Sequence, residues 1–263
     1  MLAEARVILD EIVAEKRREH ARRRPMTLDA LWAQVEALPP PRDFAAALRG
    51  PKSAPPRVIA EFKRRSPSAG AIRPGADPAV IAPAYAAAGA AALSVLTDVS
   101  FFDGALAHVE VARNACALPV LRKDFLLDER DLLEARLAGA DAALLIVRLL
   151  DAATLRALLT VAARADLHIL VEAHNDAEIA TALAAGARIV GVNHRDLDTL
   201  VIDLSLSARA RAAAPDAILV AESGIQTAAH VAQMRAHGAD AILVGEALMR
   251  AADPGAALRE LLS

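Results

Sequence analysis

The 263-residue sequence predicts an α/β protein, a single (β/α)8 barrel with an N-terminal helical extension. After residue 57, short apolar runs alternate with amphipathic helical runs, and the ends of the apolar runs lie 21 to 34 residues apart. This spacing accommodates a strand, a crossover helix and two loops. The apolar runs contain mostly Val, Ile, Leu and Ala without strict alternation, as parallel strands covered on both faces do. Eight such units are typical of a closed barrel, and a doubly wound open sheet is the main alternative.

The strand candidates follow one another between residues 58 and 245. They are residues 58–63, 92–97, 119–123, 142–147, 168–172, 189–193, 217–222 and 241–245. Four of them are preceded by a glycine, at Gly89, Gly139, Gly186 and Gly238. We expect each glycine to end the preceding helix in the left-handed conformation.

Residues 1–57 match neither pattern and form the extension. Apolar residues recur at helical spacing from Leu2 to Val13, a weaker helical run covers 27–37, and a short piece covers 44–48. This segment holds too little apolar surface to fold alone, so we expect residues 1–263 to form one domain, with the extension packed on the barrel of 58–263. Acidic residues near the start argue against a signal peptide. The basic stretch 16–24 is expected to be a solvated helix end that complements the helix dipole.

Bulk composition excludes several classes of protein. The net charge is −3, which gives no electrostatic reason to bind nucleic acid. The single cysteine, Cys116, cannot form an internal disulfide; we expect a small buried residue in a cytoplasmic protein rather than a nucleophile. The stretch 79–97 is uncharged, but Asp77-Pro78 indicates a helix start and Gly89 a helix end, so a helix and a buried strand explain it without a membrane. The oligomeric state stays open, and a monomer is compatible with the sequence.

Lysine usage points to proton transfer. Only four of the 30 basic residues are lysines, and two of them, Lys63 and Lys123, close predicted strands. Arginine stays protonated in proteins, whereas the pKa of a lysine can be lowered enough for it to give up a proton. Compositional drift that spared a few lysines is the alternative explanation.

Other polar residues stand at the ends of the predicted strands. The carboxyl ends of barrel strands converge at one mouth, where reacting groups are held. Glu61 shares a strand face with Lys63, because residues two apart point the same way. Together with Lys123 and Glu172 they would bring two ammonium groups and two carboxylates together, a crowding that separates acids from bases. Structural ion pairs around the barrel are the alternative.

A phosphate site is predicted after the last two strands. Glu222-Ser223-Gly224 ends the seventh strand and Gly245-Glu246 ends the eighth, and glycines at these places let backbone N–H groups face an anion. We expect Glu246 to contribute its N–H while its carboxylate turns away. The segment 62–70 after the first strand, with three consecutive cations and with Pro67 and Gly70, suits a mobile lid or a ligand-binding loop, and a solvated surface loop is the alternative.

No cofactor is expected. His168, Glu172 and His174 share one strand face and are the candidate metal ligands, but His168 would lie about 13 Å from Glu172 along the strand, too far for joint coordination of one ion. The sequence has no His-Glu-x-x-His or paired-cysteine spacing, no Gly-x-Gly-x-x-Gly and no Walker-type loop.

An ordered set of motifs resembles the indole-3-glycerol phosphate synthase family, a group of TIM-barrel lyases of tryptophan biosynthesis, over nearly the whole chain. The motifs are Ile-Leu-Asp-Glu-Ile-Val at 8–13, Pro-Arg-Asp-Phe at 41–44, Ile-Ala-Glu-Phe-Lys-Arg-Arg-Ser-Pro-Ser at 59–68, Leu-Ser-Val-Leu-Thr-Asp at 93–98, Phe-Asp-Gly at 102–104, Pro-Val-Leu-Arg-Lys-Asp-Phe at 119–125, Gly-Val-Asn-His-Arg-Asp-Leu at 191–197 and the two glycine turns. The resemblance implies a carboxy-lyase that closes the ring of 1-(2-carboxyphenylamino)-1-deoxyribulose 5-phosphate, with loss of carbon dioxide and water.

The resemblance also implies roles for individual residues. Lys123 matches the general acid for the ketone oxygen, and Glu172 matches the carboxylate that stabilises the cationic intermediate. Lys63 and Glu61 match residues for substrate-carboxylate binding and dehydration, and Asn193 matches a group at the reacting sugar hydroxyl. The remaining matches bind the substrate, its phosphate or its anthranilate ring, and they are Ser66, Phe102, Phe125, Arg195, Glu222, Ser223, Gly224, Gly245 and Glu246.

Two other functions compete with this hypothesis. Phosphoribosylanthranilate isomerase, a barrel for a related sugar phosphate, has an essential cysteine at the end of its first strand, where this chain has Phe62-Lys63. A catalytically silent phosphate-binding barrel would lack Lys123 and Glu172.

One position departs from the family: His194 stands where asparagine is more usual, and strand parity points it away from the mouth.

Overall fold

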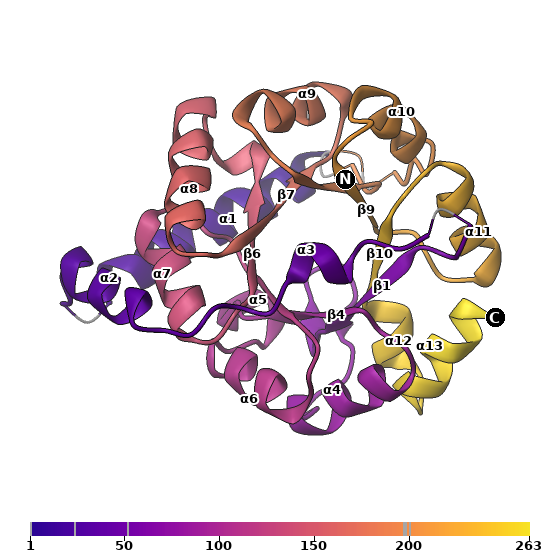
Figure 1. Cartoon of the computed structure of the whole chain (residues 1–263), viewed down its shortest axis with the longest axis horizontal. Coiled ribbons are helices and arrows are strands. Elements are labelled where there is room, and N and C mark those ends of the chain that lie inside the picture. The colour runs from indigo at the N-terminus through magenta and orange to yellow at the C-terminus, as the bar shows by residue number, and fades with distance from the viewer. Residues whose placement is uncertain (1, 24, 52, 197–198, 200) are drawn as a thin grey trace.

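The computed structural model is a closed barrel of eight parallel strands (Figure 1). The strands are β1 (Arg57–Phe62), β4 (Ala92–Leu96), β5 (Val120–Lys123), β6 (Ala142–Ile146), β7 (His168–Ala173), β8 (Ile189–Asn193), β9 (Ile218–Glu222) and β10 (Ala241–Val244). Ile59 of β1 lies opposite Ala92 of β4 on one side and Leu243 of β10 on the other, which closes the ring. The barrel prediction is therefore confirmed, and the open-sheet alternative is wrong.

The structure describes residues 2–23, 25–51, 53–196, 199 and 201–263, with side chains in the first helix from Leu9 onward. Arg24, Lys52 and Leu197, which occur in the patterns above, lie outside the described residues.

Helices surround the strands and alternate with them along the chain. The outer helices are α4 (Pro78–Ala87), α6 (Ala107–Ala115), α7 (Glu129–Leu137), α8 (Ala152–Arg164), α9 (Asp176–Ala185), α10 (Leu206–Ala213), α11 (Ala228–Ala236) and α13 (Pro254–Leu262). The shorter elements are β2 (Arg65–Ser66), β3 (Gly70–Ala71), α5 (Val99–Phe102), the 3-10 helix η1 (Val147–Leu149) and α12 (Glu246–Arg250). Asp77 caps α4 as predicted, with Pro78 in its first turn. The four glycines expected to end helices all have positive φ, from 81° to 96°.

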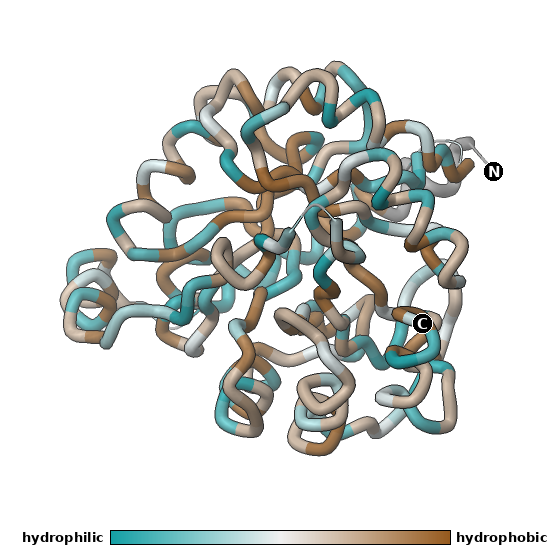
Figure 2. Tube along the Cα trace, turned by 45° about the vertical axis from the view of Figure 1, so that its right-hand side comes forward, coloured by the Kyte–Doolittle hydropathy of each residue, from teal (hydrophilic) through white to brown (hydrophobic). Residues whose placement is uncertain are grey.

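Two layers of apolar side chains hold the barrel together. One layer lies between strands and helices, and the other fills the interior of the barrel. Figure 2 shows that the central strands are made mostly of apolar residues. Phe44 and Leu48, at the short helix α3 (Phe44–Ala47), are fully buried and belong to the interior layer. Figure 1 shows α3 lying over the centre of the strand ring. Burying a large apolar side chain contributes about 1.5–3 kcal/mol, so the extension is part of the barrel core.

The first helix, α1 (Leu2–Ala21), is anchored by buried charges. The side chain of Lys16 is only 6% exposed, and its Nζ lies 3.0 Å from Asp98 Oδ2 and 2.9 Å from Asp124 Oδ1. Further along, Arg23 pairs with Asp128 and Asp131 at the N-terminus of α7. The prediction of a solvated basic helix end is therefore wrong for Lys16 and Arg23, because the barrel presents carboxylates to which they bind. It is confirmed for Arg17, Arg18 and Arg22, which are exposed.

The second helix, α2 (Leu28–Glu36), packs on α7 at the edge of the molecule. Trp32 Nε1 donates to Glu129 Oε1 at 2.7 Å, and the Arg164 guanidinium stacks 3.8 Å from the Trp32 ring centroid. A cation over an indole ring is stabilising, and it ties α2 to α8 as well.

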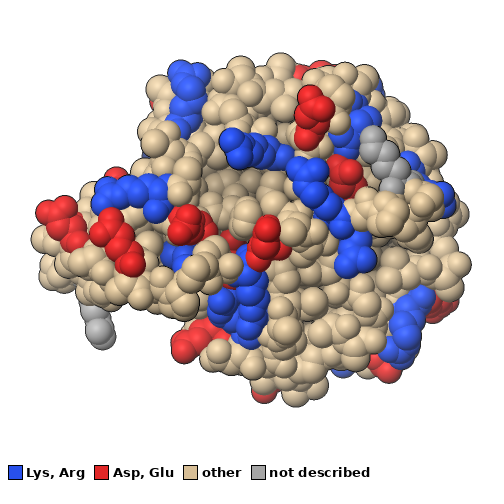
Figure 3. Space-filling model, in the orientation of Figure 1, with Lys and Arg blue, Asp and Glu red and all other residues tan. Residues whose placement is uncertain are grey.

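The surface carries both signs of charge. Figure 3 shows basic and acidic side chains interspersed over one face of the molecule.

Cys116 is half-buried, more exposed than the sequence predicted, because it follows α6 in a connecting segment. Among the described residues, no helix has both the length and the apolarity needed to cross a membrane.

Candidate active site

A cavity of about 700 Å³ opens at the carboxyl ends of the strands. Every residue that the sequence analysis assigned to the site lines this cavity. They come from strand ends and from the loops that follow, so segments separated by up to 185 positions, from Glu61 to Glu246, meet in one place.

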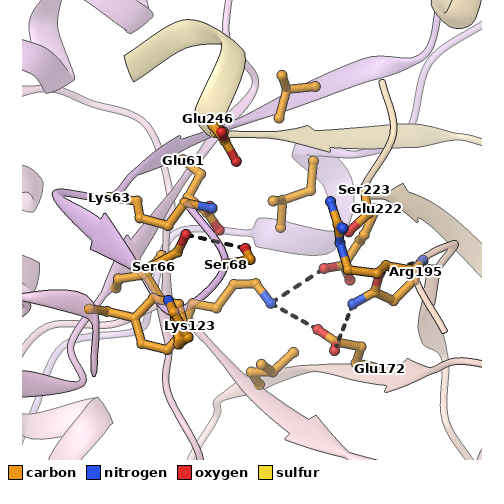
Figure 4. Close-up of a pocket in the computed structure, with 18 of the residues that line it drawn as sticks. Glu61, Lys63, Ser66, Ser68, Lys123, Glu172, Arg195, Glu222, Ser223 and Glu246 are labelled. Atoms are coloured by element: carbon orange, nitrogen blue, oxygen red, sulfur yellow. Dashed lines mark hydrogen bonds and ion pairs between the residues drawn. The ribbon is translucent and has the colours of Figure 1, made fainter. Parts of the chain in front are cut away.

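Lys123, the last residue of β5, lies between two carboxylates (Figure 4). Its Nζ lies 2.8 Å from Glu172 Oε2 and 3.4 Å from Glu222 Oε2. Burial alone would lower the pKa of Lys123, but the charges of Glu172, Glu222 and Glu61 raise it well above its ordinary value. Lys123 is thus a firmly protonated ammonium group, and the lowered lysine pKa considered from the sequence is wrong for this residue.

Glu172 of β7 is held by three neighbours. Lys123 donates to Oε2, while Asn193 Nδ2 donates to Oε1 at 3.1 Å and His174 Nε2 lies 3.1 Å from the same oxygen. Burial would raise the pKa of Glu172, but the charges of Lys123 and His174 lower it well below its usual range. Glu172 is therefore an anion whose two oxygens face different partners.

The pKa of Glu222 of β9 is shifted in the opposite direction. Burial and the negative charges of Glu172 and Glu61 outweigh the attraction of Lys123 and raise the pKa of Glu222 to about 8. Its Oε1 is buried and accepts no hydrogen bond from the described residues. Gly191 of β8 makes room for this carboxyl group, since a Cβ at Gly191 would overlap Glu222 Oε1. The crowding predicted from the sequence thus moves the pKa values of two neighbouring carboxyl groups in opposite directions.

A second ion pair lies elsewhere in the same cavity. Lys63 Nζ lies 2.7 Å from Glu61 Oε1, and Ser94 Oγ donates to Glu61 Oε2 at 3.4 Å. A Cβ at Gly245 would overlap the Glu61 carboxylate. Gly245, the glycine after β10, was predicted to bind phosphate. The position of the Glu61 side chain requires a glycine there, independently of any bound anion.

The two turns predicted to bind phosphate line the same cavity. Ser223 and Gly224 have positive φ of 65° and 77°, and the side chains of Ile202 and Leu204 fill the space beside Gly224. The half-exposed Glu246 carboxylate pairs with Arg250 Nε at 3.0 Å, one turn further along α12.

The apolar side of the cavity is aromatic and aliphatic. The rings of Phe102 and Phe125 pack with centroids 5.9 Å apart, and Leu96 joins them in the lining. Leu9 and Ile12 of α1 also line the cavity. The loop after β1 contains the β2–β3 hairpin, in which Ser66 Oγ accepts from Ala69 N–H at 3.1 Å.

A family model described as "Indole-3-glycerol phosphate synthase" matches residues 9–261 of the chain. The chain belongs to the indole-3-glycerol phosphate synthase family. A protein of that name from Roseiflexus sp. (strain RS-1) is 50% identical over 97% of both chains. "Indole-3-glycerol phosphate synthase 2" of Streptomyces coelicolor is 49% identical over 97% of this chain and 98% of its own.

Solved structures of lower identity share the fold. A crystal structure of 3-hexulose-6-phosphate synthase covers 78% of this chain and 98% of its own with a TM-score of 0.62, at 19% identity. Thiamine phosphate pyrophosphorylase from Pyrococcus furiosus covers 78% of this chain and 93% of its own with a TM-score of 0.58, at 18% identity. At these identities the likeness supports the barrel alone.

Sequence reasoning missed two contributions to the site of this indole-3-glycerol phosphate synthase family member. Leu9, Glu11 and Ile12 line the cavity from α1, and no strand-end pattern could place a helix there. His174 was considered only as a metal ligand, yet it contacts Glu172 from outside the cavity lining. Its position one residue after β7 was the available signal, because such residues lie close to the mouth.

The other six histidines, all among the described residues, also lie outside the cavity lining, and three of them have contacts that bear on possible function. His194 points away from the mouth as predicted, with Nε2 2.7 Å from Ser207 Oγ. His168 lies 3.5 Å from Asp43 of the extension. His20 lies near Asp128 and Asp131 in an arrangement that could hold a cation, but Arg23 already binds both carboxylates.

Proposed function

We propose that this chain catalyses the reaction for which its family is named. The substrate is 1-(2-carboxyphenylamino)-1-deoxyribulose 5-phosphate, and the products are indole-3-glycerol phosphate, carbon dioxide and water. The observation that carries the proposal is the cluster within one cavity of Lys123, whose Nζ lies 2.8 Å from Glu172 Oε2 and 3.4 Å from Glu222 Oε2.

Ring closure requires an acid at the ketone oxygen. As the aromatic carbon that bears the carboxylate attacks the ketone carbon, negative charge develops on that oxygen, and Lys123 donates a proton to it. The attack leaves positive charge on the ring and its nitrogen. Glu172, held as an anion near Lys123, stabilises this charge electrostatically. Loss of carbon dioxide then restores the aromatic ring.

Dehydration completes the indole. A proton leaves the carbon next to nitrogen and the new hydroxyl leaves as water, so this step needs a base and an acid. Glu172 assists proton removal, and the Lys63–Glu61 pair serves the substrate carboxylate and the departing hydroxyl. Asn193, which donates to Glu172, holds the reacting sugar hydroxyl.

Substrate binding divides between the two sides of the cavity. Phe102 and Phe125 offer aromatic faces to the anthranilate ring. The turns at Ser223-Gly224 and Gly245 offer backbone N–H groups to the phosphate. The other predicted binding residues, Ser66, Arg195 and Glu246, lie in the same lining. The proposed partner is thus a small phosphorylated molecule, handled without a cofactor in the cytoplasm.

The test uses the purified full-length chain and the synthetic aminodeoxyribulose phosphate. Formation of indole absorbance, with release of one carbon dioxide per product, is the expected result. The matched control is the Lys123→Met chain under the same conditions. Absence of product from the unaltered chain would refute the proposed function.

A further inference from the structure

The carboxylate of Glu172 is also contacted by a side chain outside the cavity lining. His174 is fully buried, and its Nε2 lies 3.1 Å from Glu172 Oε1. This Nε2 makes no hydrogen bond to the described residues, so its approach to Glu172 is a charge contact. Asn193 donates to the same oxygen, which leaves Oε2 directed at Lys123. Oε1 of Glu172 is therefore fixed by Asn193 and His174, and Oε2 is the reactive oxygen that faces Lys123.

A second carboxylate holds His174 in place. Glu178 Oε2 accepts from the backbone N–H of His174 at 2.9 Å and lies 3.0 Å from its Nδ1. Glu178 Oε1 accepts from Asn175 Nδ2 at 3.0 Å and lies 3.2 Å from Arg148 Nε. A chain of contacts thus runs from η1 and α9 through the imidazole to the cavity.

Both ring nitrogens of His174 face carboxylates, so both are best satisfied as N–H donors, which requires the imidazolium form. Burial would lower the pKa of His174, but the two carboxylates at its ring nitrogens, Glu172 and Glu178, raise it to about 9. The charged or titratable groups that face this pair are Lys123 from β5, Glu222 from β9, Glu178 from α9 and, through Glu178, Arg148 from η1.

We propose that His174 is a positioning residue that holds Glu172 Oε1 and keeps Glu172 ionised while Lys123 gives up its proton, and that Glu178 positions His174. This inference rests on the proposed function of Glu172. When Lys123 becomes neutral, Glu172 loses one of its two cationic neighbours. The His174 imidazolium remains beside Glu172 and keeps it ionised. The cationic intermediate is therefore still stabilised by the negative charge of Glu172.

Two substitutions of His174 separate charge from position. His174→Gln keeps a polar amide near Glu172 and removes the positive charge. His174→Ala removes the positive charge and the polar group together. We expect kcat to fall between about 10-fold and 100-fold in His174→Ala and less in His174→Gln, with KM within about threefold in both. Because a neighbouring cation lowers a carboxyl pKa, the acid limb of the kcat profile should move up by about one pH unit in both variants. We expect Glu178→Gln to move the acid limb of the kcat profile in the same direction, by a smaller amount.

The control is His168→Gln, on the same strand at the other end of the barrel, which should leave the acid limb in place. A readout independent of turnover follows the His174 imidazole by NMR as pH changes. We expect its titration near pH 9 in the unaltered chain and at lower pH in Glu172→Gln and Glu178→Gln. A neutral His174 ring at pH 7, or an unmoved acid limb in His174→Gln, would overturn the inference. Inactivity of the unaltered chain would instead refute the proposed function, and the NMR titration would still decide the role of His174.

Discussion

Replacing Lys16 by methionine tests how the extension is joined to the barrel. Methionine keeps most of the aliphatic stem and removes the ammonium group. Lys16 Nζ lies 3.0 Å from Asp98 Oδ2 and 2.9 Å from Asp124 Oδ1, and these carboxylates are 1% and 2% exposed. Asp124 retains Arg122 at 3.0 Å, but Asp98 Oδ2 accepts no hydrogen bond from the described residues and depends on Lys16.

The expected cost follows from the burial of Asp98. Removing one partner of a buried ion pair typically costs 3–5 kcal/mol, because the other charge stays buried without compensation. We take about 3 kcal/mol, since Asp124 is still paired. For a domain of this size each kcal/mol lowers Tm by roughly 2–4 °C, so the midpoint should fall by roughly 6–12 °C. Asp98 also caps α5, which carries Phe102, so KM should rise as well.

The assay is thermal and urea unfolding followed by circular dichroism, with Arg18→Met as the matched control. Arg18 lies on the same helix and pairs with Glu15 at 2.6 Å, but its side chain is 62% exposed. An exposed pair contributes about 0–1 kcal/mol, so this control should melt close to the unaltered chain. We propose that the extension and barrel unfold together, so one transition is expected. Equal midpoints for the two variants would refute the anchoring argument.

Four further outcomes test the site. Lys123→Met should nearly abolish turnover while phosphate-ligand affinity stays within about tenfold, and unchanged turnover in a steady-state assay would remove Lys123 from the mechanism. Glu172→Gln should lower the rate by about 10²–10⁴, and a loss below about threefold would count against its role. Gly191→Ala should push the Glu222 carboxyl away from Lys123 and lower kcat/KM by about tenfold or more, whereas unaltered kinetics would show that the position of Glu222 is immaterial. Chelators should leave activity intact, and inhibition that added metal reverses would overturn the metal-free mechanism.

The polar residues at the strand ends could be predicted to share one site, because that prediction depends only on a local rule. Residues two apart on a strand share a face, and the carboxyl ends of parallel strands converge. Glu61 and Lys63 therefore could be expected to meet, and they lie 2.7 Å apart. The assignments of individual roles came from the family resemblance and remain predictions.

The same reasoning could not reach features set by long-range packing. Lys16 seemed a solvated cation because its own helix offers only Glu19 nearby, while Asp98 and Asp124 are more than 80 positions away. Glu172 and Glu222 have the same side chain at the same kind of strand end, yet their pKa values move in opposite directions. Their difference depends on how many charges lie within a few ångströms.

The sequence by itself determined the order of strands and helices, the ends of the helices and the set of polar residues at the mouth, because these follow from local periodicity, capping and strand parity. Only the tertiary structure decided that the strands close into a ring, that α1 lines the cavity and that His174 supports Glu172. These depend on contacts between segments far apart in the chain. Buried charge is stabilised or neutralised according to all of its neighbours together, and no single segment contains them all.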